Sequence, residues 1–272
     1  MNATKLFFRP GLSKGERTVW ILSYTTVSRE PRVIRQALAL QRAGWRVVVC
    51  GFAEPDDCPL SWHFLRLPSG FSYPRLVTRT FGLMRMVGRM LARRAPLAVL
   101  RETGARIYNQ AVPEFRWIGC SLADFLRDSP ALRPDLVISH DYYTADTGLR
   151  LARLSGAKFS VDCHEYARGQ YLADPAWVRE QRPIVKALQD HFLARADAVT
   201  TVCAGIAKLL DEEQTLRRQV TVVRSVPSLQ VQPFRSCSER IVVLYHGVIS
   251  PVRGLHLAVA SMRLWRPEIE LV

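Results

Sequence analysis

Residues 134–166 read PDLVISHDYYTADTGLRLARLSGAKFSVDCHEY, and this stretch decides the fold. An apolar run at 135–139 (DLVIS) and another at 158–163 (KFSVDC) flank a helical pattern that stops at Gly156. Continuous apolar character is typical of strands that are covered on both faces, and glycine commonly follows the last turn of a helix. The stretch therefore predicts a strand–helix–strand unit of a buried parallel sheet.

The same alternation recurs along the chain, with helix-length segments between short apolar runs. One such segment runs from Pro31 to Ala43 and stops at Gly44. Alternating strands and helices predict an α/β fold, a doubly wound parallel sheet of the Rossmann type. The further predicted strands are 19–24, 46–51, 198–202 and 220–223.

This pattern breaks at 224–239, where proline and serine are frequent, and a second strand–helix–strand unit begins at residue 240. Only about 35 residues remain, too few to bury a core of their own, so we expect a second Rossmann-like domain that is truncated. The predicted organisation is an N-terminal domain over 1–226, a linker over 227–239 and the first part of a C-terminal domain over 240–272.

The 272 residues include 38 basic and 24 acidic side chains, a formal net charge of +14. Nearly all of the excess lies in residues 1–106, which hold 18 basic and 6 acidic side chains. Such an excess indicates nucleic acid, an anionic membrane surface or a phosphorylated substrate as partner. No apolar run is long enough to span a membrane, no signal-peptide core is present, and the six cysteines show no zinc spacing. We expect a cytoplasmic protein, peripheral at the inner face of a membrane.

Much of the basic excess lies in a segment at 75–106 that begins with a predicted helix at 75–94 (RLVTRTFGLMRMVGRMLARR). A basic amphipathic helix is typical of a membrane-surface element, and the alternative is a helix that packs on the sheet with its arginines in water. Nucleic acid is disfavoured, because few aromatic residues interleave and no nucleic-acid-binding motif accompanies the segment. The predicted apolar face holds Leu76, Val77, Leu83, Met84, Val87, Met90 and Leu91, and the basic face Arg79, Arg85, Arg89 and Arg93.

Two successive predicted strands end in a histidine beside acidic residues. His140-Asp141 follows the first of them, and Asp162, His164 and Glu165 lie at the end of the second. The carboxyl ends of parallel strands meet at one edge of the sheet, where ligands bind, so we expect a substrate site there. Near pH 7 a histidine serves as acid, base or hydrogen-bond donor, although capping or a structural hydrogen bond is an alternative role. We predict no metal, because no third ligand follows at a fixed interval.

The loop after the first predicted strand, residues 25–32 (TTVSREPR), lies at the same edge of the sheet. It lacks the GxGxxG pattern of dinucleotide-binding folds, so NAD or FAD finds little support. Ser28 or Glu30 is placed to cap the next helix, with Pro31 in its first turn. Capping alone and ligand binding both remain open for this loop.

Three separated segments resemble glycosyltransferase family 4, the retaining enzymes of GT-B fold. They are SREPRVIRQALALQRAGWRVVVCG at 28–51, the stretch at 134–166 and LYHGVISPVRGL at 244–255. They follow the order and spacing of the family, and the similarity covers nearly the whole chain except residues 52–130. The resemblance implies an acceptor-side N-terminal domain and the start of a donor-binding domain.

The resemblance implies transfer of a sugar, with retention, from a nucleotide-diphosphate donor. The implied acceptor is a saccharide or lipid-linked acceptor in cell-surface polysaccharide or glycolipid biosynthesis. His164 matches the family histidine that lies against the donor sugar, and Asp162 and Glu165 match its flanking acids. The implied acceptor-side residues are Glu30, Arg32, His140 and Asp141.

In the second domain, the resemblance implies that Gly247, Arg253 and Gly254 approach the donor diphosphate. Arg253 replaces the usual lysine and can grip a diphosphate bidentately, whereas Val248 stands where arginine is typical. The family usually works without a metal, so we expect no cofactor beyond the nucleotide-sugar substrate. The E-x7-E segment that holds the donor nucleotide is absent from these residues, so we expect no turnover from residues 1–272 alone. A non-catalytic scaffold or interaction protein with a GT-B-like acceptor domain is the alternative.

Overall fold

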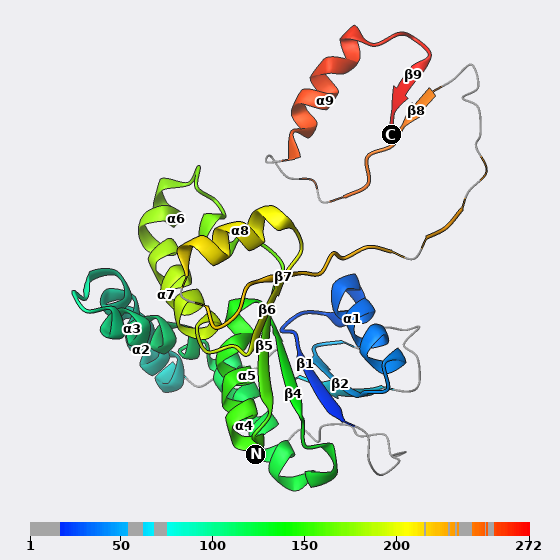
Figure 1. Cartoon of the computed structure of the whole chain (residues 1–272). Coiled ribbons are helices and arrows are strands. Elements are labelled where there is room, and N and C mark those ends of the chain that lie inside the picture. Colours follow the sequence, from blue (N-terminus) through cyan, green and yellow to red (C-terminus); the bar gives the residue numbers. More distant parts are fainter. Residues whose placement is uncertain are drawn as a thin grey trace. The chain divides into compact units, whose positions relative to one another are not determined.

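The computed structural model describes residues 17–53, 62–67, 75–214, 216–227, 229–231, 233, 241–247, 249 and 253–272. The chain divides into two compact units, residues 1–226 and 227–272, and each is described by itself. Figure 1 shows the elements of both, coloured along the sequence.

In the described residues, the first unit contains a parallel seven-stranded sheet of order β3-β2-β1-β4-β5-β6-β7 (Figure 1). Its central strands are buried almost throughout, as their continuous apolar sequences predict. The order reverses between β1 and β4, which confirms the predicted doubly wound α/β fold. The strands are β1 (Thr18–Leu22), β2 (Arg46–Gly51), β3 (His63–Arg66), β4 (Leu136–His140), β5 (Lys158–Cys163), β6 (Ala198–Thr201) and β7 (Thr221–Val222).

Alternate side chains of β1 enter two different apolar cores. On one face of the sheet, Val19 and Ile21 pack with Val33 of α1 (Pro31–Arg42). On the other face, Trp20 and Leu22 belong to a larger core with α4 (Pro113–Asp128), α5 (Asp141–Ser155) and α7 (Arg182–Leu193). Helices therefore hold the strands from both sides, which fixes the loops at the carboxyl edge of the sheet.

The predicted helix ends agree with the structure, but one strand was not predicted. Gly44 and Gly156 follow α1 and α5 with φ of +81° and +70°, the left-handed conformation that glycine adopts readily. The short edge strand β3 was not predicted, because its sequence HFLR has no continuous apolar run. The remaining elements of this unit are η1 (Val27–Arg29), α2 (Arg75–Arg94), α3 (Ala98–Gln110), η2 (Pro130–Leu132), η3 (Ala167–Gly169), α6 (Pro175–Glu180) and α8 (Ala204–Glu213).

Helices α2 and α3 form a hairpin whose backbones touch. A Cβ atom on Gly88 would lie 2.7 Å from the Gly104 carbonyl oxygen and 2.6 Å from the Tyr108 backbone nitrogen. A Cβ atom on Gly104 would lie 2.5 Å from the Leu91 Cβ atom. This contact decides which side of α2 faces the protein.

Of the two alternatives left open for this helix, packing on the sheet with the apolar face inward and the arginines in water is not what the structure shows. Arg85 lies 4.4 Å from the Tyr108 ring centroid and donates to the Tyr108 hydroxyl at 2.6 Å. Arg93 donates to Glu180 at 2.7 Å. The side chains of Leu76 and Val77 lie outside the described residues. An apolar stripe is instead exposed, by 37–58%, and consists of Leu83, Met86, Val87 and Met90.

Gly88→Ala is expected to lower the free energy of unfolding by about 1–3 kcal/mol, the usual range for overpacking a tight contact. Gly82→Ala is the matched control in the same helix, because a Cβ atom there meets nothing within 4 Å. Alanine at that exposed helical position is expected to stabilise by about 0.5–1 kcal/mol. Denaturant unfolding followed by circular dichroism measures both variants. Effects of the same sign would contradict the backbone contact.

In the second unit, β8 (Ile241–Val243) and β9 (Ile269–Leu271) pair in parallel. Between them lie α9 (Leu255–Ser261) and the 3-10 turn η5 (Met262–Leu264), the order that the sequence predicts. No described residue from 241 to 272 is buried. Among all helices in the described part of the chain, none is long and apolar enough to cross a membrane.

Candidate active site at the carboxyl edge of the sheet

The strand order reverses between β1 and β4, and open α/β sheets bind ligands beyond their carboxyl edge at such a point. β4 ends there with His140, which lies opposite Asp162 of β5 in the sheet register. His164 follows the last residue of β5. The sheet thus brings the two predicted histidine-containing strand ends into one cluster.

A hydrogen bond of 2.6 Å joins His140 Nδ1 to His164 Nε2. Burial lowers the pKa of His140 to about 3, against an opposing effect of the Asp162 charge, so the ring is neutral at pH 7. Its Nε2–H donates to Gln36 Oε1 at 2.9 Å, which leaves Nδ1 as an acceptor. His164 Nε2 therefore carries the shared proton, and His164 Nδ1 faces Asp141 Oδ2 at 3.6 Å. The pair fixes the tautomer and orientation of His164.

Asp162 lies beneath this pair, fully buried, in an ion pair with Arg32. Arg32 Nε and Nη2 each donate to one Asp162 carboxylate oxygen at 2.5 Å, and Thr200 Oγ1 donates at 2.5 Å. Burial alone would raise the pKa of Asp162, but the hydrogen bonds and charges around it lower the pKa overall. Asp162 Oδ2 lies 3.6 Å from both His140 Nδ1 and His164 Nε2. The ionised carboxylate therefore lies beside the shared proton on His164 Nε2, without a hydrogen bond to either ring.

Asp141 has a left-handed backbone, with φ of +61°, at the first residue of α5. This conformation costs a non-glycine residue on the order of 1–3 kcal/mol and persists only where contacts hold it. Its Oδ1 accepts the His164 backbone N–H at 3.0 Å, and its Oδ2 accepts the Tyr143 hydroxyl at 3.5 Å. Burial raises the pKa of Asp141; His164 opposes this, and Asp162 and Glu165 add to it. The carboxyl group is thus placed to exchange a proton with His164 or with a bound hydroxyl.

The two remaining predicted residues of this unit lie at the margin of the cluster. Glu165 is exposed beside His164, and Glu30 is half-buried in the loop after β1. Glu30 stands at the N-cap position of α1, but its side chain makes no capping hydrogen bond, and Ser28 lies within η1. Of the two roles left open for this loop, capping of α1 by Ser28 or Glu30 is not what the structure shows, whereas Pro31 begins α1 as expected.

The predicted diphosphate-binding residues belong to the second unit. Arg253 is exposed, and Gly254 precedes α9 with φ of +69°. At Gly247, a Cβ atom would lie 2.9 Å from the Tyr245 hydroxyl. Their role toward a donor stays a prediction.

Sequence reasoning missed two residues that complete the histidine cluster. Gln36 lies one helical turn after Arg32, so both project from the same face of α1, and this spacing is readable from the sequence. Thr200 pairs with Asp162 in the register of β5 and β6, which no sequence pattern reveals.

His140, Asp162 and His164 also place one potential metal-ligating atom each within 4.8 Å of one another. Among the described residues, this donor set suits a divalent cation poorly. The Asp162 oxygens already accept hydrogen bonds from Arg32 and Thr200, and the guanidinium group of Arg32 would repel a cation. The expectation that the site works without a metal remains a prediction.

Acidification is expected to destabilise the chain through His140. The folded ring has a pKa of about 3 and the unfolded ring one of about 6.5, so below pH 6.5 the unfolded state binds more protons. This group should reduce the free energy of unfolding by up to about 1.4 kcal/mol per pH unit between pH 6 and 4. His140→Gln cannot titrate and should show a shallower slope in denaturant unfolding at pH 6, 5 and 4. Equal slopes would contradict a buried neutral ring.

Comparison with known proteins gives one family and several solved structures of similar fold. A family model described as "Glycosyl transferase 4-like domain" matches residues 30–225, a range that includes every candidate residue of the first unit. A search of curated protein sequences found no match. Sucrose-phosphate synthase from Thermosynechococcus elongatus has a TM-score of 0.59 at 14% identity, covering 94% of this chain and 61% of the synthase.

A second similar structure is Arabidopsis thaliana UGT89C1. Complexed with UDP-L-rhamnose, it has a TM-score of 0.51 at 15% identity, and the match covers 95% of this chain and 69% of that one. Complexed with quercetin, the same protein has a TM-score of 0.52 at 13% identity, with coverage of 94% and 69%. At these identities the likeness shows a shared fold alone. This chain spans only about three fifths of the length of the synthase.

Proposed function

The chain belongs to the glycosyl transferase 4-like family, and from that premise we propose that the full-length protein transfers a sugar from a nucleoside-diphosphate donor to a saccharide or lipid-linked acceptor. The main support for the proposal is a cluster of polar side chains at the carboxyl edge of the sheet, where the strand order reverses. It consists of His140, Asp141, Asp162 and His164, all within the residues that the family model matches. We further propose retention of the anomeric configuration and a role in cell-surface polysaccharide or glycolipid synthesis.

His164 is the proposed catalytic residue. Its Nε2–H is held by His140, its backbone N–H is held by Asp141, and its side chain is 18% exposed. A ring fixed in one tautomer at the sheet edge keeps a constant orientation toward a bound sugar, which is what preorganised stabilisation requires. Glu165, exposed beside it, is proposed to assist at the same sugar.

Asp162 and Arg32 are proposed as positioning residues. Their polar atoms are used within the protein, because Arg32 also donates from Nη1 to the Val223 carbonyl oxygen at 2.9 Å. Neither side chain is free to touch a substrate, since both are buried. They act on the reaction through the histidine pair above them.

On the acceptor side we propose Asp141 and Glu30. Burial raises the pKa of Asp141, which favours a carboxyl group that takes and releases a proton. The carboxylate of Glu30 is not used for capping α1 and so remains available to an acceptor hydroxyl. In transfer, the acceptor oxygen bonds to the anomeric carbon as the bond from that carbon to the diphosphate breaks.

The departing diphosphate needs positive partners. Gly247, Arg253 and Gly254 of the second unit are proposed for this part, and Arg253 carries an exposed guanidinium group that matches the phosphate geometry. The donor is a substrate, and no metal or other cofactor is proposed.

We also propose that the protein acts at the inner face of a membrane, through the segment 75–106. The support is the exposed apolar stripe of α2, flanked in sequence by many arginines and only one acid, Glu102. Apolar and basic side chains together are typical of elements that lie on an anionic bilayer.

The proposed function is tested by incubating the full-length protein with UDP-, GDP- and ADP-sugars and a panel of saccharide and lipid-linked acceptors. The expected result is acceptor-dependent release of the nucleoside diphosphate, with a product whose anomeric configuration matches the donor by proton NMR. A product of inverted configuration would contradict retention. Absence of release with every donor would favour a non-catalytic scaffold.

A further inference from the structure

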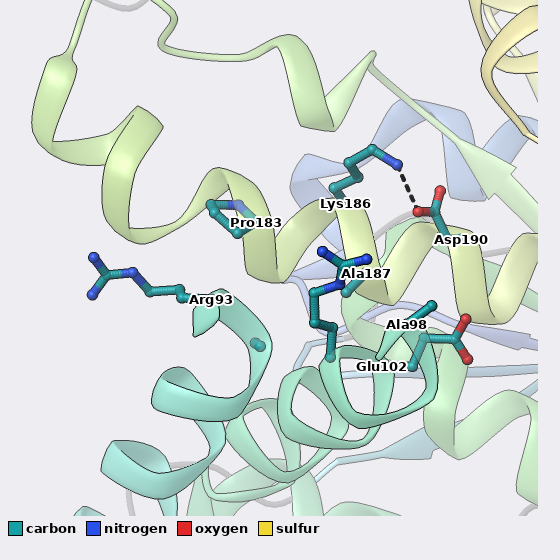
Figure 2. A pocket seen from close by; sticks show the side chains of 9 residues that line it. Arg93, Ala98, Glu102, Pro183, Lys186, Ala187 and Asp190 are labelled. Carbon is teal, nitrogen blue, oxygen red and sulfur yellow. Dashed lines mark hydrogen bonds and ion pairs between the residues drawn. The ribbon is translucent and has the colours of Figure 1, made fainter. Parts of the chain in front are cut away.

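A cavity of about 230 Å³ lies outside the candidate active site, between α2, α3 and α7. Its wall comes from the last turn of α2, the first turns of α3 and the first turns of α7 (Figure 2). The volume corresponds to several water molecules at about 30 Å³ each, enough for a phosphate group and a small substituent. The lining residues are Ala92, Arg93, Ala98, Arg101, Glu102, Pro183, Lys186, Ala187 and Asp190.

The acidic residues of this cavity already have partners in the protein. Asp190 accepts from Arg168 at 2.7 Å and from Lys186 at 2.8 Å, the pair drawn in Figure 2. Glu102 accepts from His191 Nδ1 at 2.9 Å. Both carboxylates are therefore paired with side chains of the protein. They do not neutralise every cation around the cavity.

The cations are in part unpaired. Lys186 shares Asp190 with the buried Arg168 and remains 53% exposed at its side chain. Arg101 is exposed, and its side chain has no hydrogen bond or ion pair to any residue in the described ranges. Figure 2 shows Arg93 extending away from Lys186 and Asp190, and it donates instead to Glu180. Arg101 is thus free to bind an anion in the cavity, and the exposed ammonium group of Lys186 keeps N–H donors beyond the one that it gives to Asp190.

Exposed apolar side chains adjoin this basic cavity. Leu97 and Val99, on either side of the lining residue Ala98, are 59% and 62% exposed, and Leu100, next to Arg101, is 39% exposed. The apolar stripe of α2 belongs to the same helical hairpin. A ligand that suits this surface carries a phosphate beside hydrocarbon, which is the chemistry of a membrane lipid.

We propose that the cavity between α2, α3 and α7 binds the phosphate headgroup of an anionic membrane lipid, through Arg101 and Lys186. Leu97, Val99 and Leu100 then contact the hydrocarbon next to that headgroup. This inference rests on the membrane contact proposed above and adds a specific site to it. A guanidinium and an ammonium group bind phosphate oxygens by charge-assisted hydrogen bonds, whereas a bare basic surface attracts any anion.

The test measures binding of the full chain to vesicles by flotation. One set contains phosphatidylcholine with phosphatidic acid, a second contains phosphatidylcholine with oleate at matched surface potential, and a third contains phosphatidylcholine alone. Wild type is expected to prefer the phosphatidic acid vesicles over the oleate vesicles about tenfold, as charge-assisted bonds to phosphate predict. Equal binding to these two sets would overturn the headgroup site.

Two double variants separate the site from general charge. Arg101→Gln with Lys186→Gln should abolish the preference between the two anionic vesicle sets. Arg79→Gln with Arg94→Gln, which removes the same charge from exposed positions of α2 outside the cavity, should weaken both and keep the preference. Loss of the preference in both double variants would overturn the assignment to the cavity. All four positions are exposed or half-exposed, so the variants are expected to fold, which thermal unfolding checks.

Two further measurements separate the headgroup site from the membrane contact and from binding of a soluble phosphate. Met86→Gln with Met90→Gln removes half of the apolar stripe and should weaken binding to all anionic vesicles without changing the preference. Failure of wild type to bind any vesicle would overturn the membrane contact itself while leaving sugar transfer unaffected. Glycerol 3-phosphate should bind at least about tenfold more weakly than vesicle phosphate, because it lacks the hydrocarbon. Equal affinity would assign the cavity to a soluble phosphate.

Discussion

Arg32→Met is expected to lower the free energy of unfolding by about 3–5 kcal/mol, the usual cost of removing one partner of a buried ion pair. Asp162 is fully buried, and Arg32 supplies two of the three hydrogen bonds that its carboxylate accepts. Without the guanidinium group, a buried charge is left beside two histidines. Denaturant unfolding at pH 7 measures the loss.

The matched control is Arg35→Met, on the same helix. Arg35 has a hydrogen bond to Ser225 Oγ at 2.7 Å near the surface, so the substitution should cost less than about 1 kcal/mol. Similar losses in the two variants would show that the buried Arg32–Asp162 pair stabilises the fold no more than a hydrogen bond near the surface.

The pH dependence gives a second criterion with a definite sign. In wild type, the pKa of Asp162 is lowered by folding, so its contribution to stability is present at pH 7 and is lost as the pH falls through the folded pKa. In Arg32→Met, burial without the guanidinium group should raise that pKa above the unfolded value, and protonation then relieves the unpaired charge. The deficit of the variant is therefore expected to shrink from pH 7 to pH 4. A deficit that stays constant would contradict the ion-pair account.

His164→Ala is expected to lower kcat for sugar transfer by the full-length protein by about 10²- to 10⁴-fold, the range for loss of a positioned catalytic side chain. The side chain is partly exposed, and its loss leaves the Arg32–Asp162 pair intact, so stability should change by less than about 1.5 kcal/mol. KM for the acceptor should change much less than kcat, because His164 is assigned to the reacting sugar.

His191→Gln is the control for loss of a histidine elsewhere. His191 lies on α7 and bonds to Glu102, away from the histidine pair, and glutamine retains a hydrogen-bonding group. Its kcat should stay within about twofold of wild type, because the side chain lies away from the histidine pair and glutamine keeps a hydrogen-bonding group. If kcat fell as far in His191→Gln as in His164→Ala, impaired folding would explain the loss, and His164 would need no role at the sugar.

The sequence predicted the parts of the site that depend on strand ends. Strands β4 and β5 are continuous apolar runs joined through one helix, and parallel strands so connected end at the same edge. This alone places His140 and His164 near each other, and the hydrogen bond at 2.6 Å follows from the register that pairs His140 with Asp162.

Long-range pairings were beyond sequence reasoning. Arg32 and Asp162 are 130 positions apart, and their pairing depends on how α1 crosses the sheet, which apolar periodicity does not specify. The orientation of α2 escaped prediction for a similar reason. Its apolar side chains surround much of the helix, and the close approach of Gly88 to Gly104 on another helix selects the buried side.

The central claim is that the histidine cluster at the carboxyl edge of the sheet is a site of sugar transfer. The most direct test is release of nucleoside diphosphate by the full-length protein, measured with and without acceptor, in wild type and His164→Ala side by side. We predict acceptor-dependent release in wild type and at least a hundredfold slower release in the variant. Equal release by the two proteins would contradict the claim.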